Sequence, residues 1–374
     1  MNAAGIIFSN LNQDTISELT TDRTLAAIPF GCRYRFVDFC LSNLINVNIS
    51  NICIVANYNY RSLIDHIGSG KDWDMARRTG GIQMIAPFQT SHTSDSKLNC
   101  THLEALCNMK DYILEFKEDY VIIMDTDQVV NIDLSAVVDS HEATGADITM
   151  VTTKIREDFS SRNRRIMAKT ENGKITRILT SKTYTDRAPE MCINTFVMRT
   201  PYLVNLLNSA EDKNLTSLTD HLLNTYEHAN YFTYCYDGYV ASITDFQEYY
   251  QASMELTSSD EAKESLLWRK DAPIYTKVHN SAPTMYSADA VVRDSMIADD
   301  CVIEGTVINS ILSRNVRVAK GAVVKNSVLY WGTTVGKGAS LNCVVTDKDV
   351  YITDGVSLSG NKNLPIYIEK KRKV

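Results

Sequence analysis

The sequence lacks a long hydrophobic run and an excess of basic residues, and we expect no leader peptide. No stretch reaches the roughly 18 apolar residues that would span a bilayer, and the N-terminal AAGIIF follows no basic region or cleavage site. Lys and Arg number 38 against 45 Asp and Glu, and the net charge of −7 disfavours nonspecific binding to nucleic acid or an anionic membrane. We therefore expect a cytoplasmic protein with no nucleic-acid and no membrane partner.

Metal-binding cysteine patterns are also missing. The nine cysteines form neither a CxxC pair nor a Cys/His cluster at zinc spacing, and most lie in apolar runs. We interpret them as buried thiols. The one basic run, Lys370 to Lys373, is interpreted as a solvated terminus, with a phosphate or effector contact as the alternative.

Apolar strand-like runs alternate with helical patterns over residues 1–255. Helical spacing of apolar residues marks DFCLSNLINVN, YRSLIDHI and THLEALCNMKDYILEF. The strand-like runs are 5–10, 51–57, 81–88, 120–127, 147–153 and 193–200. This alternation predicts an α/β domain with a mostly parallel sheet covered on both faces. Ligands bind beyond the carboxyl ends of such strands, so Ser9 onward and Asp125 to Asn131 are the candidate site segments.

An internal repeat begins near residue 285. VAKGAV starts at Val318, VGKGAS at Val335 and ITDGVS at Ile352, a step of 17 residues. The pattern is that of hexapeptide repeats, in which the aliphatic side chain points into a parallel β-helix. An irregular β-sandwich is the less favoured alternative. We expect an α/β domain at 1–255, a polar linker at 256–284 and a β-helix domain at 285–374.

The β-helix suggests two properties. Its coils bury apolar surface mainly against one another, so the exposed ends and edges favour an oligomer. Many β-helices carry acyltransferase sites that use a histidine in the coils. None of the seven histidines lies beyond residue 285, which argues against acyl transfer.

The combination of these two domains with PFGCRYRFVDFCLSN at 29–43 resembles the bacterial ADP-glucose pyrophosphorylases. In that family the corresponding sequence is PFGGKYRxIDFxLSN. The resemblance covers essentially the whole chain. It implies a Rossmann-like nucleotidyltransferase domain followed by a left-handed parallel β-helix. The family makes ADP-glucose and pyrophosphate from ATP and glucose 1-phosphate, with Mg²⁺, for glycogen synthesis.

The triphosphate loop implied by the resemblance has lost its key residues. The family's AGGxGTRL aligns with residues 9–16, where every glycine is replaced and Thr15 stands in place of the arginine. Glycine lets a backbone approach phosphate closely, whereas side chains crowd that space. Leu25 stands where the family has a phosphate-binding lysine. Phosphoryl transfer depends on such cations, because the reacting groups are anions.

Three arginines could still bind an anion. Arg23 matches the family's arginine, and Arg33 and Arg35 add positive charge nearby. One hypothesis is that these residues form a binding site for an anionic effector such as a sugar phosphate. The equally favoured alternative is that they pair with local carboxylates such as Asp38.

The metal site implied by the resemblance is half present. Asp127 in MDTDQVVNIDL aligns with one metal-binding aspartate, but Ser242 stands in place of the other. Mg²⁺ is usually held by one or two carboxylates together with substrate phosphates. We interpret Asp127 as a remnant metal ligand or as a structural cap. Asp245 lies three positions beyond Ser242 and need not face the same site.

Two further segments differ from the family. KLNCTHLEAL near 98–106 replaces a nucleotide-contacting GTADA run in a loose alignment. ILTSKT replaces FxEKP, keeping Lys182 but placing Ser181 where the glutamate would be. Lys182 is a candidate contact for a sugar phosphate, and a solvated lysine is the commoner alternative.

Together these losses predict a catalytically deficient chain most like the regulatory, GlgD-type subunit of the family. It would need no cofactor itself, whereas Mg²⁺ would serve a catalytic partner. The expected partner is a catalytic ADP-glucose pyrophosphorylase subunit, in a heterotetramer or another hetero-oligomer, with a homo-oligomer as the alternative. The competing hypothesis is an active sugar-phosphate nucleotidyltransferase with an atypical site, in which Asp125 or Asp245 replaces the second metal ligand.

Overall fold

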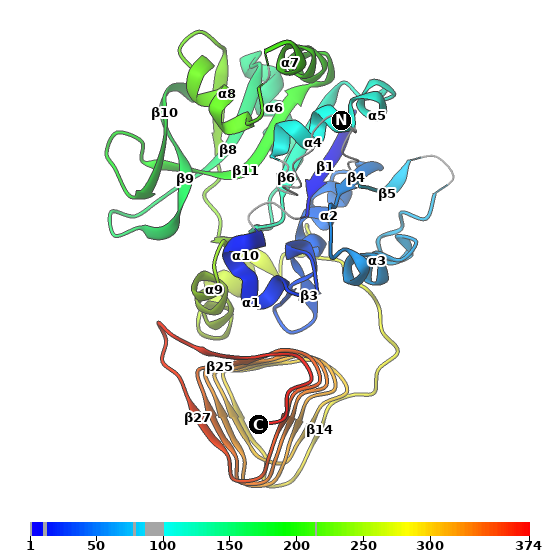
Figure 1. Ribbon diagram of the computed structural model, residues 1–374, viewed down its shortest axis with the longest axis vertical. Coiled ribbons are helices and arrows are strands. Elements are labelled where there is room, and N and C mark those ends of the chain that lie inside the picture. The colour runs from blue at the N-terminus through cyan, green and yellow to red at the C-terminus, as the bar shows by residue number, and fades with distance from the viewer. Residues whose placement is uncertain (1, 10–12, 78–79, 87–100, 214) are drawn as a thin grey trace, which may run out of the picture.

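The computed structural model describes residues 2–9, 13–77, 80–86, 101–213 and 215–374. An α/β domain lies on one side of a triangular coil of short strands, as Figure 1 shows. This arrangement confirms the fold class expected from the sequence, a nucleotidyltransferase-like domain followed by a left-handed parallel β-helix.

The α/β domain is built on a nine-stranded sheet. Its order is β5 (Gly81–Ile85), β4 (Asn51–Val55), β1 (Ala3–Phe8), β6 (Tyr120–Asp125), β11 (Glu190–Arg199), β8 (Ile148–Lys154), β12 (Tyr231–Cys235), β10 (Lys174–Thr183) and β9 (Ser160–Glu171). Strands β5, β4, β1 and β6 pair in parallel. Strand β11 runs antiparallel to both β6 and β8, so one reversed strand interrupts the parallel part of the sheet.

Helices cover both faces of this sheet because its central strands are apolar on both sides. Ile7 of β1 packs in one cluster, whereas its neighbours Ile6 and Phe8 pack in the cluster on the other face. The first cluster includes residues from α2 (Phe36–Asn46) and α6 (Leu134–Thr144). The second includes residues from α4 (His102–Asn108), α7 (Thr200–Lys213) and α8 (Leu218–Thr225).

The hairpin β9–β10 was not expected from the sequence. Its two strands pair antiparallel, and β12 of the main sheet adjoins β10. Charged residues such as Arg162, Arg164 and Lys174 interrupt its apolar alternation. The pattern therefore lacked the continuous aliphatic run that marked the central strands.

The segment PFGCRYRFVDF forms a tight hairpin that leads into α2. Strand β2 (Pro29–Phe30) pairs with β3 (Tyr34–Arg35), and the turn places Gly31 at φ 56° and Cys32 at φ 63°. The backbone N–H of Arg35 donates to Asp38 Oδ2 at 2.9 Å, which caps the start of α2. Structural requirements of a turn and a helix start therefore account for several residues of this segment.

Three five-stranded parallel sheets form the walls of the β-helix. They are β14-β17-β20-β23-β26, β15-β18-β21-β24-β27 and β16-β19-β22-β25-β28. From β14 to β28, in the order of their numbers, the strands span Met285–Tyr286, Val291–Arg293, Met296–Ile297, Val302–Ile303, Thr306–Ile308, Ile311–Leu312, Arg317–Val318, Val323–Lys325, Val328–Leu329, Thr334–Val335, Ser340–Asn342, Val344–Thr346, Tyr351–Ile352, Ser357–Ser359 and Ile366–Ile368. Because each of the three strands in a coil points an aliphatic residue inward, the interior of the triangle is filled by apolar side chains.

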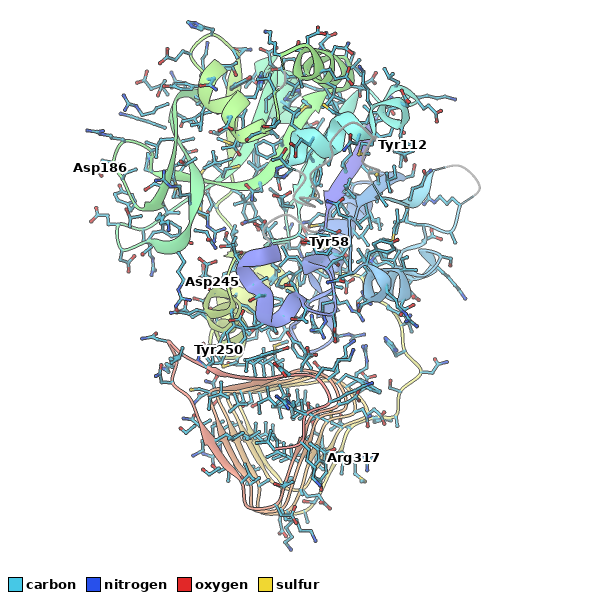
Figure 2. All side chains as sticks on the ribbon, viewed as in Figure 1. Tyr58, Tyr112, Asp186, Asp245, Tyr250 and Arg317 are labelled. Atoms are coloured by element: carbon cyan, nitrogen blue, oxygen red, sulfur yellow. The ribbon has the colours of Figure 1, made fainter. Side chains whose placement is uncertain are left out.

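Two helices join the domains. They are α9 (Phe246–Ser258) and α10 (Asp260–Leu266), and α10 falls within the expected linker 256–284. Tyr249 and Tyr250 of α9 are buried in one cluster with Val328 and Val345 of the β-helix. Figure 2 shows Tyr250 at this junction. No helix within the described ranges is long and apolar enough to cross a membrane.

Candidate functional site

The site expected from the sequence lies at the carboxyl end of β6. Strand β7 (Gln128–Val130) follows β6 and pairs antiparallel with β13 (Val240–Ser242), with Ser242 opposite Gln128. The N–H of Ile243 donates to the carbonyl of Asp127 at 2.7 Å. The fold thus places Asp127 and Ser242 on adjacent segments, with Ser242 opposite Gln128 and Ile243 bonded to the Asp127 backbone. A shared metal site at these two positions stays a prediction.

Asp127 is fully buried and lies among amide groups. Its Oδ1 accepts a hydrogen bond from Gln128 Nε2 at 3.0 Å, and Asn194 Nδ2 lies 3.4 Å from Oδ2. Asn194 adopts a left-handed backbone conformation with φ 51° at an irregularity in β11. Both amide groups are hydrogen-bond donors, which a buried carboxylate can accept.

Ser242 contributes a hydroxyl that has no hydrogen-bond partner among the described residues. Because residue 242 is a serine, Asp127 is the one carboxylate of the aligned pair. No cluster of three or more His, Cys, Asp or Glu side chains suited to a metal occurs in the described part of the chain. These residues fit a two-carboxylate Mg²⁺ site poorly.

Asp245, which could have replaced the missing carboxylate, has a structural contact. Its Oδ1 accepts the N–H of Glu248 at 2.7 Å and so caps the N-terminus of α9. Its Oδ2 lies 3.7 Å from Arg162 Nε. Glu248 in turn binds Arg165 at 2.8 Å and Ser161 at 2.6 Å. The position of Asp245 is explained by capping rather than by metal binding.

The aligned phosphate-binding positions are occupied by structural contacts. Thr15 donates its hydroxyl to the carbonyl of Thr244. Leu25 lies in a short 3₁₀ helix (Leu25–Ala27), is only 1% exposed and packs with the cluster at the domain junction. Of the aligned loop, residues 10–12 lie outside the described residues.

A partly buried His–Asp pair was not predicted from the sequence. His102 Nε2, at the start of α4, lies 2.6 Å from Asp125 Oδ1 at the end of β6. Burial lowers the pKa of His102, but the nearby Asp125 carboxylate outweighs it, so the pKa is raised. His102 also packs edge-on against Phe8 at 4.7 Å. Asp125 is therefore engaged by His102, and no short motif joined these residues in the sequence.

Lys182 lies exposed on β10. Ser181, which precedes it, donates its hydroxyl to the carbonyl of Thr183 at 2.8 Å. No carboxylate lies within 4.0 Å of Lys182 in the described part of the chain. The structure places it on a solvent-facing strand and leaves the sugar-phosphate contact a prediction.

Arg23 is buried at the domain junction. It is 2% exposed, and its Nη2 binds both carboxylate oxygens of Asp347, at 2.6 and 2.8 Å. Tyr367 donates its hydroxyl to the same carboxylate at 2.9 Å. The guanidinium also lies 5.8 Å from the ring centroid of Tyr330. The structure thus separates Arg23 from the other two arginines and ties it to the β-helix.

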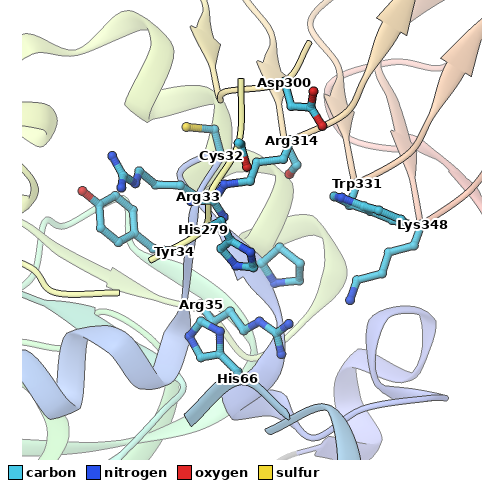
Figure 3. Close-up of a pocket in the computed structure, with 13 residues that line it drawn as sticks. Cys32, Arg33, Tyr34, Arg35, His66, His279, Asp300, Arg314, Trp331 and Lys348 are labelled. Atoms are coloured by element: carbon cyan, nitrogen blue, oxygen red, sulfur yellow. The ribbon is translucent and has the colours of Figure 1, made fainter. Parts of the chain in front are cut away.

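Arg33 and Arg35 line a cavity between the two domains. The cavity has a volume of about 260 Å³, and Figure 3 shows the side chains that line it, Arg33 and Arg35 among them. Its other basic side chains are Arg314 and Lys348 of the β-helix, His66 of α3 (Arg61–Ile67) and His279 of the connecting segment. Trp331 forms part of its wall, and Asp300 is the one carboxylate among the lining residues that the structure describes. The cavity therefore has the charge of an anion site.

Burial lowers the pKa values of two cations in this cavity. Burial lowers the pKa of Lys348 to about 8, and the positive charges of Arg35 and Arg23 add to this effect. Burial likewise lowers the pKa of Arg35 to about 10, although Asp38 opposes it. Two cations with lowered pKa values would gain from an anionic ligand, because the ligand would favour their charged forms.

A second cleft adjoins the cavity. It shares Arg35, His66 and Lys348 with the first and adds Arg61 and Lys370. Lys370 Nζ lies 3.3 Å from Asp22 Oδ2. The basic C-terminal run therefore begins beside a cleft lined with basic side chains. This position by itself does not decide between a solvated terminus and a ligand contact.

Comparisons with known proteins agree with this architecture. Residues 15–257 match the profile of the nucleotidyl transferase family, and residues 280–364 match that of the GlmU-like, C-terminal hexapeptide family.

Similar proteins come from two groups. The chain is 30% identical over 366 residues to glycogen biosynthesis protein GlgD of Bacillus subtilis (strain 168), covering 98% of this chain and 95% of that protein. It is 33% identical to GlgD of Geobacillus stearothermophilus, covering 86% and 82%. It is 30% identical to glucose-1-phosphate adenylyltransferase of the same organism, covering 83% and 80%.

Proposed function

Because this chain belongs to the nucleotidyl transferase family, as a GlgD-like glycogen biosynthesis protein related to glucose-1-phosphate adenylyltransferase, we propose that it is a regulatory, catalytically deficient subunit. It modulates a catalytic partner that makes ADP-glucose from ATP and glucose 1-phosphate. The complex is a hetero-oligomer in the cytoplasm. Mg²⁺ serves the partner, and this chain requires no cofactor.

One observation carries the proposal. Ser242 stands on β13 where the family resemblance implies a second carboxylate besides Asp127, and the nearby Asp245 caps α9. A Mg²⁺ ion held by one protein carboxylate depends on the substrate phosphates for its other anionic ligands. The positions aligned with phosphate-binding cations hold Thr15 and the buried Leu25. Chemistry on a triphosphate therefore lacks charge stabilisation at several points.

The cavity between the domains supports a regulatory role. Arg33, Arg35 and Lys348 converge on it from both domains, so an anion bound there contacts the α/β domain and the β-helix together. An effector changes a partner only if it favours one of two states with different partner contacts. We propose that a sugar phosphate is this effector, bound at Arg33 and Arg35, with Arg23 holding the junction through Asp347.

The test measures ADP-glucose synthesis with ATP, Mg²⁺ and glucose 1-phosphate. The chain is assayed alone, its catalytic relative from the same cell is assayed alone, and the co-expressed pair is assayed after co-purification. We expect no turnover above background by the chain alone and an altered turnover or effector response of the pair. Turnover by the chain alone at the rate of its relative would show that the chain is an active enzyme with an atypical site.

Matched variants separate catalysis from regulation. Asp127→Asn in this chain should leave turnover of the pair within about twofold, because Asp127 holds no reacting group. The aligned substitution in the catalytic relative should abolish most of its turnover, on the order of 10³-fold. Arg35→Gln should instead weaken the effector response of the pair. Loss of turnover on Asp127→Asn in this chain would assign it a catalytic role.

A further inference from the structure

Lys348 of the β-helix lines both the cavity between the domains and the cleft that adjoins it. Its side chain lies beside Trp331, and its amine points toward Arg35, as Figure 3 shows. Within the described ranges this amine donates no hydrogen bond and has no carboxylate within 4.0 Å. The side chain is nevertheless half-buried. Burial without a partner disfavours the charged ammonium form.

The carboxylate next to Lys348 in the chain is engaged by other groups. Asp347 accepts two hydrogen bonds from Arg23 Nη2, at 2.6 and 2.8 Å, and one from the hydroxyl of Tyr367 at 2.9 Å. Burial and the positive charges of Arg35 and Arg23 lower the pKa of Lys348 to about 8, although Asp347 opposes them. About a quarter of the Lys348 side chains are therefore neutral amines at pH 7.5, against about one in a thousand for an ordinary lysine.

The surroundings of this amine select the kind of electrophile that could reach it. A neutral lysine beside other cations is a nucleophile, because its lone pair is free to attack a carbonyl carbon. Arg33, Arg35 and Arg314 line the same cavity, and guanidinium groups bind phosphate oxygens in a planar, two-point geometry. An acyl phosphate has both matching parts, a phosphate for the arginines and a carbonyl carbon one oxygen atom away for the amine.

We propose that Lys348 is a site of covalent acylation by small acyl phosphates that enter the cavity between the domains. The Nζ lone pair attacks the carbonyl carbon, an N–C amide bond forms, and the C–O bond to the phosphate breaks. The phosphate leaves with the electron pair of that bond and takes up the proton that the nitrogen loses, so it departs as hydrogen phosphate. The step involves no oxidation or reduction.

Acylation changes the cavity in two ways. The product amide carries no charge, so the cavity loses one of its cations, and the added acyl group fills part of its volume. Anions therefore compete with the acyl phosphate before the reaction and bind more weakly after it. The proposal uses the same cavity as the proposed sugar-phosphate effector, but it requires neither that effector nor a catalytic partner.

Mass spectrometry of the full chain tests the proposal. The chain alone is incubated with acetyl phosphate, and acetylated peptides are quantified over time. Lys348 should react about tenfold faster than Lys337, which is exposed on the same β-helix outside both clefts. The Lys348 rate should rise with pH and level off above about 8. Burial lowers the pKa values of His66 and His279, which stay neutral in this range, and Arg35 keeps its charge to about 10.

A second acyl donor separates binding of the phosphate from reactivity of the amine. Arg33→Gln should slow acetylation of Lys348 by acetyl phosphate about tenfold, as should saturating sulfate, because both remove the phosphate contact. The same variant should react with uncharged p-nitrophenyl acetate within about twofold of wild type. Arg317→Gln, at an exposed position outside both clefts, is the matched control and should change neither rate.

Three results would overturn the proposal. The first is acetylation of Lys348 no faster than that of Lys337. The others are a rate with acetyl phosphate that sulfate leaves unchanged, and one that Arg33→Gln leaves unchanged. None of them bears on ADP-glucose synthesis by the co-purified pair, so the proposed regulatory function would be tested separately.

Discussion

Arg23 and Arg35 come from one short segment but lie in different environments. Arg35 lines the cavity between the domains, and its Nη1 donates to the carbonyl of Ser62 at 2.7 Å. Arg23 turns the other way and forms a buried pair with Asp347 of the β-helix. At the scale of single residues, one arginine is available to an anion, whereas the other already has its carboxylate.

Breaking the Arg23–Asp347 pair should destabilise the fold strongly. Arg23→Met leaves the Asp347 carboxylate buried with Tyr367 and without a cation, which costs about 3–5 kcal/mol. Denaturant unfolding measures the loss. Lys370→Met, which removes the exposed pair with Asp22, is the control and should change stability little. Similar small losses for both variants would show that the buried pair contributes no more than a surface pair.

Anion binding in the cavity should weaken as pH rises through about 8, where the Lys348 ammonium loses its proton. Sulfate is a suitable probe because it does not titrate in this range. Its affinity, read by calorimetry, should fall roughly tenfold from pH 7 to pH 9 in the wild-type chain.

The titration of Lys348 changes folding stability in the opposite direction to anion affinity. Lys348 has its pKa lowered from 10.5 to about 8 in the folded state, so between these values the unfolded chain binds more protons and this group makes stability rise with pH. His66 and His279, whose pKa values burial lowers, are neutral throughout the window, and Arg35 keeps its charge. Lys348→Gln should bind sulfate weakly and equally at both pH values. A persisting tenfold fall in that variant would assign the titration to another group.

At the scale of elements, a column of asparagines stiffens one corner of the β-helix. Asn309 donates to Asn326 at 2.7 Å, and Asn326 donates to Asn342 at 2.9 Å. Asn309 and Asn326 adopt φ 46° and 47°, a left-handed conformation that asparagine tolerates. Each turn of the coil therefore supports the next through a side-chain amide.

Two substitutions at Asn326 separate the ladder from the backbone conformation. Asn326→Gly keeps the left-handed conformation and loses the amide bonds, for a cost of about 1–3 kcal/mol. Asn326→Ala loses the bonds and also strains the backbone, by about 1–2 kcal/mol more. Urea unfolding should therefore rank wild type above Gly and Gly above Ala. An alanine variant as stable as the glycine variant would contradict the conformational argument.

At the scale of the whole molecule, hydrogen bonds run across the domain junction. Tyr330 of the β-helix donates to the hydroxyl of Tyr249, which donates to the carbonyl of Pro29 at 3.0 Å. Tyr250 donates to the carbonyl of Asn326 at 2.7 Å. The segment 29–35 is thus fixed from one side by α2 and from the other by the β-helix through α9. Its cavity-lining arginines sit on a rigid support.

We expect the two domains to unfold in one cooperative transition, because this buried junction links them. Calorimetry of the wild-type chain should show a single peak whose calorimetric and van't Hoff enthalpies agree. Tyr250→Ala, which removes a 1% exposed side chain from the junction, should cost about 3–5 kcal/mol or split the peak. Trp268→Ala, at a 59% exposed position, should leave it unchanged. Two separate peaks in the wild-type chain would contradict the expectation.

The fold and part of the site were predictable because their signals are local. Aliphatic runs mark the central strands, and the 17-residue step marks the coils of the β-helix. The resemblance also pointed to the segments of Asp127 and Ser242, and the pairing of β7 with β13 brings these two segments next to each other. The hairpin β9–β10 and the contact of His102 with Asp125 carried no such pattern.

The sequence by itself determined the order of the domains, the repeat and the loss of the aligned glycines, of two cations and of one carboxylate. Each of these features is defined by neighbouring residues or by a fixed spacing along the chain. Only the tertiary structure decided what the remaining polar residues do. Arg23 and Asp347 are 324 positions apart in the chain, yet the junction brings them to 2.6 Å. Asp245 caps a helix and Arg35 faces a cavity for the same reason. A charged side chain takes its partner from whatever the folded chain places beside it, and this proximity is set by packing rather than by spacing in the sequence.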